Sequence, residues 1–168
     1  MLLLLALAIR NKLGSPVLFR QQRPGLHGKP FEMLKFRSMR EVYDVDGKLV
    51  SDNKRLTDFG IWLRSTSLDE LPELWNVIKG EMSLVGPRPE QPKIVEELEA
   101  QIPFYDVRHL VKPGITGWAQ VNYPYGASVE DASRKLEFDL YYMKHYSIFL
   151  DFYVALKTLR VVISRGGR

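Results

Sequence analysis

The hydrophobic pattern near the start of the chain predicts a β-hairpin. Residues 17–19 and 31–36 are two short apolar-rich runs. Pro24-Gly25 and Gly28-Lys29-Pro30 interrupt the chain between them with residues typical of turns. Two strands joined by such turns pair most simply with each other.

Helical periodicity dominates the rest of the chain. Apolar residues recur every three or four positions in three segments, which are 71–78, 129–145 and 149–163. Residues 90–99 form a further helix, which is acidic and which we expect to be exposed. Lys79-Gly80 is a typical helix end, and 112–117 is a turn-rich connector. Residues 118–122 alternate as in a strand, which would place Trp118, Gln120 and Asn122 on one face. The pattern predicts a compact, mostly helical α+β fold with a small hairpin or sheet.

The first nine residues, MLLLLALAI, form an apolar run that Arg10 and Lys12 follow. Spanning a bilayer takes about 20 residues, so this run is too short. A signal peptide would carry its charge before the apolar run, and Gly14-Ser15-Pro16 is turn-like. Three interpretations remain open: a buried core helix, an interfacial or re-entrant segment, or the end of a longer hydrophobic helix. The abrupt start favours the last.

Charge is unevenly distributed along the chain. Residues 1–40 hold eight Lys/Arg and only Glu32, residues 41–143 hold eleven basic and eighteen acidic residues, and residues 144–168 hold five basic residues and Asp151. Basic ends suit an anionic bilayer and would also attract nucleic acid. The helix over 149–163, with Lys157, Arg160 and Arg165 nearby, is either an interfacial amphipathic helix or a helix packed on the core.

Composition removes several kinds of site. The chain has no cysteine, which excludes disulfides, thiolate nucleophiles and cysteine-based zinc sites. The three histidines show no metal-ligand spacing. The acidic loop over 44–53 lacks the glutamate that closes a calcium-binding loop. Nucleotide-binding glycine motifs are also missing from the sequence.

Asp69 and Glu70 are the strongest candidates for chemistry. Two adjacent carboxylates repel each other, so keeping both ionised favours a nearby cation. Magnesium fits because it is often shared between carboxylates and substrate phosphates, and a carboxylate can also attack phosphorus. A structural alternative stays open, because Ser67-x-x-Glu70 matches a helix capping box. Pro72 weakens that alternative, since it would fall past the first turn.

Basic and amide side chains accompany this acidic pair. Arg88 lies in Gly-Pro-Arg-Pro, where two prolines restrict its backbone for gripping phosphate, and Arg64 precedes the pair by five residues. Lys35 and Arg37 would share one face of a strand and could serve a diphosphate. Gln120 and Asn122 could bind a base or sugar through their amides. Each of these residues could equally belong to an ordinary surface or turn.

Four segments together resemble the bacterial sugar transferase family, the monotopic phosphoglycosyl transferases. They are SPVLFRQQRPG (15–25), FEMLKFRSM (31–39), RSTSLDELPELWNVIKGEMSLVGPRPE (64–90) and KPGITGWAQVN (112–122). They occur in family order and span most of the chain.

The resemblance implies transfer of a phosphosugar from a UDP-sugar to a polyprenyl (undecaprenyl) phosphate, with release of UMP. Asp69 matches the nucleophile that forms a covalent phosphosugar intermediate, and Glu70 matches the Mg²⁺ ligand. Arg64, Arg88 and Lys35 match basic residues around the bound phosphate.

The family fold is a compact α+β unit with interfacial helices and one re-entrant membrane helix. On this basis residues 1–14 are the exit half of a truncated re-entrant helix, and 15–168 are a single catalytic domain on the cytoplasmic face of the bacterial inner membrane. We expect a lipid bilayer as a partner and no nucleic acid, and we leave a homodimer open.

The chain departs from small family members after Asn122, where Tyr123-Pro124-Tyr125-Gly126 replaces Gly-Arg-Asn. The substrate contact of that arginine therefore cannot be transferred. The Tyr-Pro-Tyr form and the ending ISRGGR are similar to the C-terminal catalytic domain of larger exopolysaccharide-initiating members. Two other function classes remain alternatives: a magnesium-dependent hydrolase of nucleotide-diphosphate sugars, and a non-catalytic module for membrane or nucleic-acid surfaces.

Overall fold

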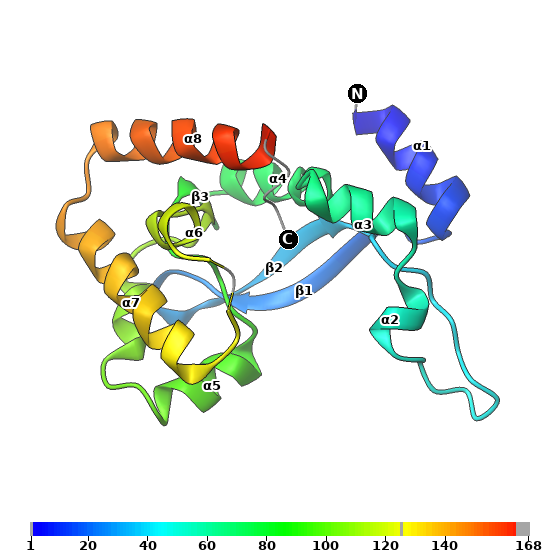
Figure 1. Ribbon diagram of the computed structural model, residues 1–168, viewed down its shortest axis with the longest axis horizontal. Helices are drawn as coiled ribbons and strands as arrows, with labels where there is room; N and C mark the ends of the chain where they lie inside the picture. The colour runs from blue at the N-terminus through cyan, green and yellow to red at the C-terminus, as the bar shows by residue number, and fades with distance from the viewer. Residues whose placement is uncertain (1, 125, 164–168) are drawn as a thin grey trace.

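The computed structural model describes residues 2–124 and 126–163 and has an α+β fold that is about half helical (Figure 1). Its strands form two small two-stranded sheets, one antiparallel and one parallel. The α+β class was predicted correctly, while the helical share is lower than "mostly helical" suggests. Tyr125 and Ser164 to Arg168, including Arg165, lie outside the described residues.

The predicted hairpin is confirmed. Strand β1 (Leu18–Pro24) pairs antiparallel with β2 (Pro30–Phe36), with Leu18 opposite Phe36 and Pro24 opposite Pro30. Apolar side chains from both faces of β2 are buried, so this strand is covered on both sides. Lys35 is therefore a charged side chain on a strand of the core.

The acidic pair lies in a 3-10 turn, η2 (Leu68–Glu70), that packs against β2 and precedes helix α4 (Glu73–Ile78). The alternative of a capping box is wrong. Ser67 has a left-handed backbone (φ 54°) and its side chain caps nothing. Pro72 is instead the residue before α4, where its missing N–H costs no helix bond. The predicted helix end is confirmed, with Gly80 at φ +78°.

Helix α4 buries its two polar residues and exposes most of its apolar ones. Glu73 and Asn76 are buried, whereas Leu74, Trp75 and Ile78 are exposed, Ile78 by 74%. Asn76 explains part of this inversion because it joins α4 to β2. Its side chain accepts a hydrogen bond from Leu34 N (3.1 Å) and donates one to the Glu32 carbonyl (2.7 Å).

The predicted strand over 118–122 is wrong. These residues form helix α6 (Trp118–Asn122), which begins after the extended Gly117 and contains the bond from Tyr123 N to Ala119 O. A strand lies just before it in the predicted connector. This strand, β4 (Gly114–Thr116), pairs in parallel with β3 (Ser83–Val85). Alternation over five residues was too short to separate a strand from one helical turn.

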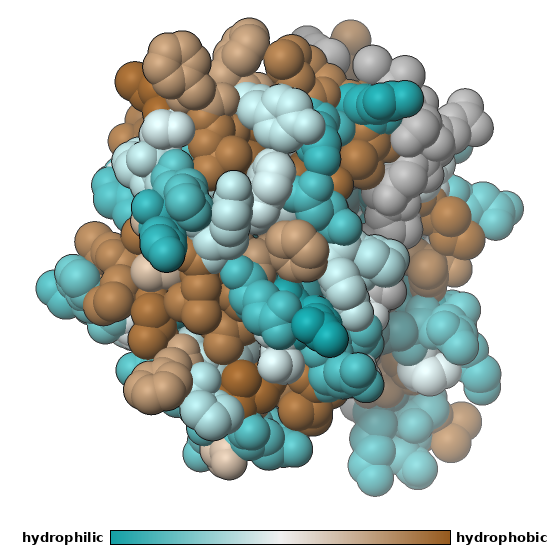
Figure 2. Space-filling model, turned by 60° about the vertical axis from the view of Figure 1, so that its left-hand side comes forward, coloured by the Kyte–Doolittle hydropathy of each residue, from teal (hydrophilic) through white to brown (hydrophobic). Residues whose placement is uncertain are grey.

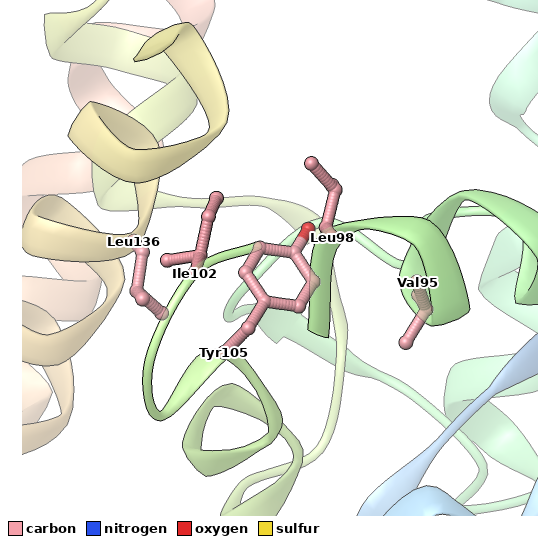
Figure 3. Packing of buried hydrophobic residues seen from close by; sticks show 5 residues of the cluster. All are labelled: Val95, Leu98, Ile102, Tyr105 and Leu136. Carbon is pink, nitrogen blue, oxygen red and sulfur yellow. The ribbon is translucent and has the colours of Figure 1, made fainter. Parts of the chain in front are cut away.

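A cluster of buried apolar residues joins helix α5 (Pro92–Glu99) and the 3-10 segment η3 (Tyr105–Leu110) to helix α7 (Val129–Lys144). Figure 3 shows Ile102 and Tyr105 between Leu136 of α7 and Leu98 and Val95 of α5. Ser128 and Asp131 form a capping box at the start of α7. Burying such large apolar side chains contributes about 1.5–3 kcal/mol each.

Helix α1 (Leu2–Leu13) packs on the rest of the chain through Ile9 and Leu13, which contact Phe36 and Leu63 in one buried cluster. Leu2, Leu3, Leu4 and Leu7 are exposed, whereas Leu5 and Ala6 are partly buried against the same cluster. Leu63 belongs to α3 (Asp58–Ser65), which follows the short helix α2 (Asp52–Arg55). The η1 turn (Leu26–Gly28) lies in the hairpin, between β1 and β2. The division of the chain into a membrane-associated helix (1–14) and a catalytic domain (15–168) stays a prediction.

Helix α8 (Ile148–Ile163) crosses over the parallel sheet and α6 (Figure 1). Val154 is fully buried, but most large apolar residues of α8 are exposed, namely Phe149, Phe152, Tyr153, Leu156 and Leu159. Among the described helices, none combines the length and the apolar character needed to cross a bilayer.

Candidate active site

The predicted site residues line one cleft of about 1140 Å³. The cleft is bounded by the hairpin, the η2 turn, the segment around Arg88, and α6. Its lining includes all eight residues singled out in the sequence, which are Lys35, Arg37, Arg64, Asp69, Glu70, Arg88, Gln120 and Asn122. Residues far apart in the chain therefore meet at one place, as expected for a binding site.

Asp69 is buried, with only 8% of its surface exposed, and lines the cleft. Burial raises the pKa of its carboxyl above the ordinary value, and the neighbouring charge of Glu70 raises this pKa further. Lys35 and Arg64 act in the opposite direction. A poorly solvated carboxylate near cations is well suited to attack an electrophile.

Glu70 is held by two cations. Its Oε1 contacts Lys35 Nζ at 2.8 Å and Arg88 NH2 at 2.5 Å. Burial by itself would raise the pKa of Glu70, but the charges of Arg88 and Lys35 outweigh it and lower the pKa to about 2. Glu70 is therefore ionised at neutral pH. Both cations contact Oε1, so these ion pairs leave Oε2 as the oxygen that could bind a further cation.

The backbone brings Arg88 over the η2 turn. Gly86 and Gly114 lie so close that a Cβ on either would collide with the backbone of the other. This approach allows the bonds from Gly86 N to Thr116 O and from Gly114 N to Pro87 O, both 2.9 Å. The Gly-Pro-Arg-Pro segment is thereby fixed at the end of β3.

Arg64 and Arg37 lie in the cleft but contact other partners. Arg64 Nε donates to Ser38 Oγ at 2.9 Å, and Arg37 forms an ion pair with Glu41 at 2.8 Å. Strand β2 ends at Phe36, but Arg37 N donates to Val17 O at 2.9 Å and continues the pairing of the hairpin by one residue, so the shared face of Lys35 and Arg37 stays a prediction. Both arginines nevertheless add positive charge to the walls of the cleft.

The helical structure of α6 separates Gln120 and Asn122, which a strand would have placed on one face. Asn122 uses both ends of its amide inside the protein, because Nδ2 donates to Trp118 O and Oδ1 accepts from Lys157 Nζ. Gln120 Nε2 donates to Ile115 O, and its buried Oε1 accepts no hydrogen bond from the described residues. Binding of a base or sugar by these amides stays a prediction.

Sequence reasoning missed three buried charged residues. Glu73 lies 3.1 Å from Lys35, and Arg108 forms an ion pair of 2.9 Å with Asp139. Arg108 also donates to the Arg88 carbonyl at 2.9 Å, which fixes the backbone of that arginine. Asp139 could have been found in the sequence, since it lies three residues from both Leu136 and Tyr142 on the buried face of α7.

The residues of the cleft fit a shared magnesium site better than a complete protein cage. No group of three or more acidic or histidine side chains within residues 2–124 and 126–163 could hold a metal. Magnesium commonly binds through one or two carboxylates together with substrate phosphates. Glu70 could meet that requirement together with a phosphate in the cleft.

Comparison with known proteins places the chain in a family. The model of a family described as "Bacterial sugar transferase" matches residues 1–165. The chain belongs to the bacterial sugar transferase family. It is 46% identical over 159 residues to an uncharacterized sugar transferase, EpsL, of Bacillus subtilis. The match covers 95% of this chain and 76% of that protein.

Two longer relatives carry more specific names. The chain is 43% identical over 169 residues to a UDP-N-acetylgalactosamine-undecaprenyl-phosphate N-acetylgalactosaminephosphotransferase of Aeromonas hydrophila (98% of this chain, 40% of that protein). It is 42% identical over 159 residues to a UDP-glucose:undecaprenyl-phosphate glucose-1-phosphate transferase of Escherichia coli (92% and 34%). The chain thus spans about two fifths and one third of these two sugar transferases.

Proposed function

We propose that this chain transfers a phosphosugar from a UDP-sugar to a polyprenyl phosphate, such as undecaprenyl phosphate, and releases UMP. The observation that carries the proposal is the cleft in which the buried Asp69 adjoins Glu70, while Lys35 and Arg88 hold Glu70. The named relatives act between UDP-sugars and undecaprenyl phosphate, which supports the choice of both substrates. Such a reaction would begin the assembly of an exopolysaccharide or glycoconjugate.

The proposed chemistry has two balanced steps. A carboxylate oxygen of Asp69 attacks the phosphorus that carries the sugar, and the bond from that phosphorus to the bridging oxygen breaks, so UMP leaves with this oxygen. A phosphate oxygen of the polyprenyl phosphate then attacks the same phosphorus and releases the Asp69 carboxylate. The product is a polyprenyl diphosphate sugar, and no oxidant, reductant or water is consumed.

The cations of the cleft would stabilise negative charge on the transferring phosphate. Lys35, Arg88, Arg64 and Arg37 all line the cleft, and positive groups fixed in advance near developing charge lower the barrier to reaction. Mg²⁺ held by Glu70 would supply further charge stabilisation at the diphosphate. Gln120 and Asn122 would border the part of the cleft that takes the sugar or base.

We place the reaction at the cytoplasmic face of the bacterial inner membrane, because the acceptor is a lipid. Helices α1, α4 and α8 lie toward the same edge of the molecule in Figure 1, and each of them carries exposed apolar residues. Figure 2 shows apolar side chains along the top edge, where Figure 1 places α8. These faces would lie in the lipid interface. A homodimer remains an open prediction.

The first test is release of UMP from a panel of UDP-sugars with Mg²⁺ and without any lipid. We expect a single burst, equal to the amount of enzyme, and we expect Asp69→Asn to abolish it because an amide oxygen is a poor nucleophile. Glu99→Gln, an exposed change on α5, is the matched control. Normal UMP release by Asp69→Asn would refute the nucleophile assignment.

Adding polyprenyl phosphate decides between transfer and hydrolysis. Transfer predicts that the labelled phosphosugar appears in the lipid fraction and that turnover continues after the burst. Free phosphosugar in the aqueous fraction, at the same rate with and without lipid, would instead establish a nucleotide-sugar hydrolase.

A further inference from the structure

Glu73 is a buried carboxylate that the proposed reaction does not use. It lies in the first turn of α4 with 1% of its surface exposed. Its Oε1 accepts no hydrogen bond of acceptable geometry in the described part of the chain, although Lys35 Nζ is 3.1 Å away. A carboxylate this deeply buried is costly unless a cation compensates it, so its presence calls for an explanation.

Glu73 is not needed to hold α4 against β2. Asn76, one turn later on the same buried face, already bonds to the backbone of β2 through both the oxygen and the nitrogen of its side-chain amide. Strand and helix are therefore joined without Glu73. The contact that Glu73 does make is to a residue of the candidate active site.

Lys35 is shared between two carboxylates. Its Nζ lies 2.8 Å from Glu70 Oε1 and 3.1 Å from Glu73 Oε1. A cavity of about 30 Å³ adjoins the group and is lined by Lys35, Glu73 and Arg88 among others. A space of this size holds about one water molecule, and the ammonium group already lies within reach of both carboxylates, so its shift from one to the other is small.

This sharing bears on how Glu70 binds a metal. Glu70 now neutralises two cations at one oxygen, and a divalent cation approaching this carboxylate would be repelled by both. If Lys35 moves toward Glu73, Glu70 is freed from one cation and the ammonium group stays paired inside the protein. If Glu73 carried no charge, Lys35 would remain on Glu70 and compete with the metal.

We propose that Glu73 is a positioning residue that draws Lys35 away from Glu70 and so keeps Glu70 available to a divalent cation. The inference rests on the proposed function, in which Glu70 binds Mg²⁺ beside a diphosphate. It assigns to Glu73 an action through Lys35 and no contact with substrate.

The test compares wild-type protein with Glu73→Gln in a binding assay without turnover. The rise in melting temperature is measured at pH 8 as MgCl₂ is titrated in the presence of UDP, which has the diphosphate but no sugar. We expect Glu73→Gln to need about tenfold more Mg²⁺ for half of the effect, as is common when a partner of a metal ligand is removed. Glu96→Gln, an exposed change on α5, should titrate like the wild type.

A Lys35→Gln background separates sharing from simple electrostatic attraction. If Glu73 acts through Lys35, Glu73→Gln should have no further effect on the Mg²⁺ midpoint once Lys35 is gone. If the tenfold shift persists in that background, Glu73 attracts the metal directly and the proposal is wrong. An unchanged midpoint in the single variant would also overturn it.

Two further measurements belong to the test: the melting temperature of Glu73→Gln and the release of UMP. We expect Glu73→Gln to melt at or above the wild-type temperature before metal is added, because a buried charge has been removed. A large fall would assign Glu73 to the fold and would contradict the proposal. If no UDP-sugar yields UMP, the proposed function fails, while the Mg²⁺ titration with UDP still decides the role of Glu73.

Discussion

Asp69 and Glu70 are neighbours in the chain, yet the structure drives their proton affinities apart. Burial and the charge of Glu70 raise the pKa of Asp69. For Glu70 the cations Arg88 and Lys35 overcome burial and lower the pKa to about 2. Divergent environments for two adjacent acids are typical of sites that assign them different tasks. Here one carboxylate is charged at neutral pH, and the other is held where its charge is poorly solvated.

A prediction at this scale concerns the pH dependence of stability through Glu73. Burial raises its pKa to about 7 from 4.5, so the folded protein binds this proton more tightly than the unfolded chain. Stability from this group is fully present below about pH 4.5 and is lost as the pH rises to about 7. The loss amounts to about 3 kcal/mol at most.

The Glu73→Gln variant should lack this loss. Its free energy of unfolding, measured by denaturant titration at several pH values, should match the wild type at pH 4.5 and exceed it at pH 8. Parallel curves for the two proteins across this range would show that Glu73 ionises as an exposed glutamate does.

The sequence predicts the identities of the site residues better than their contacts. Asp69, Glu70, Lys35, Arg64 and Arg88 are indicated by their chemical types and by four family segments, and all of them line the cleft. The sequence did not indicate that Glu73 is buried beside Lys35, because the burial of a charged side chain depends on tertiary packing. The internal pairing of Asn122 with Lys157 joins residues 35 positions apart, which local spacing cannot indicate.

Among the elements, η3 and α7 are joined by a buried ion pair that also supports Arg88. Arg108 contacts Asp139 Oδ2 at 2.9 Å, the Tyr105 hydroxyl at 2.6 Å and the Arg88 carbonyl at 2.9 Å. Breaking a buried pair by removing one partner leaves an uncompensated charge. The position of Arg88 therefore depends on a helix outside the η2 turn.

We predict that Arg108→Met lowers the free energy of unfolding by about 3–5 kcal/mol. The double variant Arg108→Met/Asp139→Leu should recover most of this loss, because no charge stays buried. Arg134→Met, which breaks an exposed pair with Glu137, should cost at most about 1 kcal/mol. Denaturant titration measures all three, and an equal cost for Arg108→Met and Arg134→Met would refute the role assigned to burial.

Long periodic elements were predictable and short ones were not. The helix over 129–145 carries many apolar residues at one period, the hairpin is marked by the turn residues between its strands, and both are confirmed. The strand β4 and the helix α6 have three and five residues, so their form depends on partners elsewhere. Parallel pairing with β3 and the close approach of Gly86 to Gly114 are contacts between distant segments.

For the whole molecule, three helices with exposed apolar faces lie toward one edge. Residues of α1, α4 and α8 such as Leu3, Trp75 and Phe149 are more than half exposed. An exposed apolar surface of this extent typically marks an interaction site. The basic residues at both ends of the chain would add attraction to an anionic lipid surface.

We predict that the triple variant Leu74→Ser/Trp75→Ser/Ile78→Ser binds anionic phospholipid vesicles at least tenfold more weakly. Burying one large apolar side chain contributes about 1.5–3 kcal/mol, and about 1.4 kcal/mol is a factor of ten. Vesicle co-sedimentation measures the difference. Val45→Ser is the control, because Val45 is fully exposed in the segment between β2 and α2, which reaches away from α8 in Figure 1. An equal effect of both changes would contradict the proposed orientation.

Because α4 buries polar residues and exposes apolar ones, saturation mutagenesis should find an unusual pattern of tolerated substitutions along this helix. In an ordinary surface helix, inward positions reject polar residues and outward positions accept them. Scored by the burst of UMP released from a UDP-sugar without lipid, α4 should instead reject leucine at Glu73 and Asn76 and accept serine at Trp75 and Ile78. Scored by growth of cells that depend on the lipid-linked product, the outward positions should become intolerant as well, so that the two screens together separate chemistry from membrane contact.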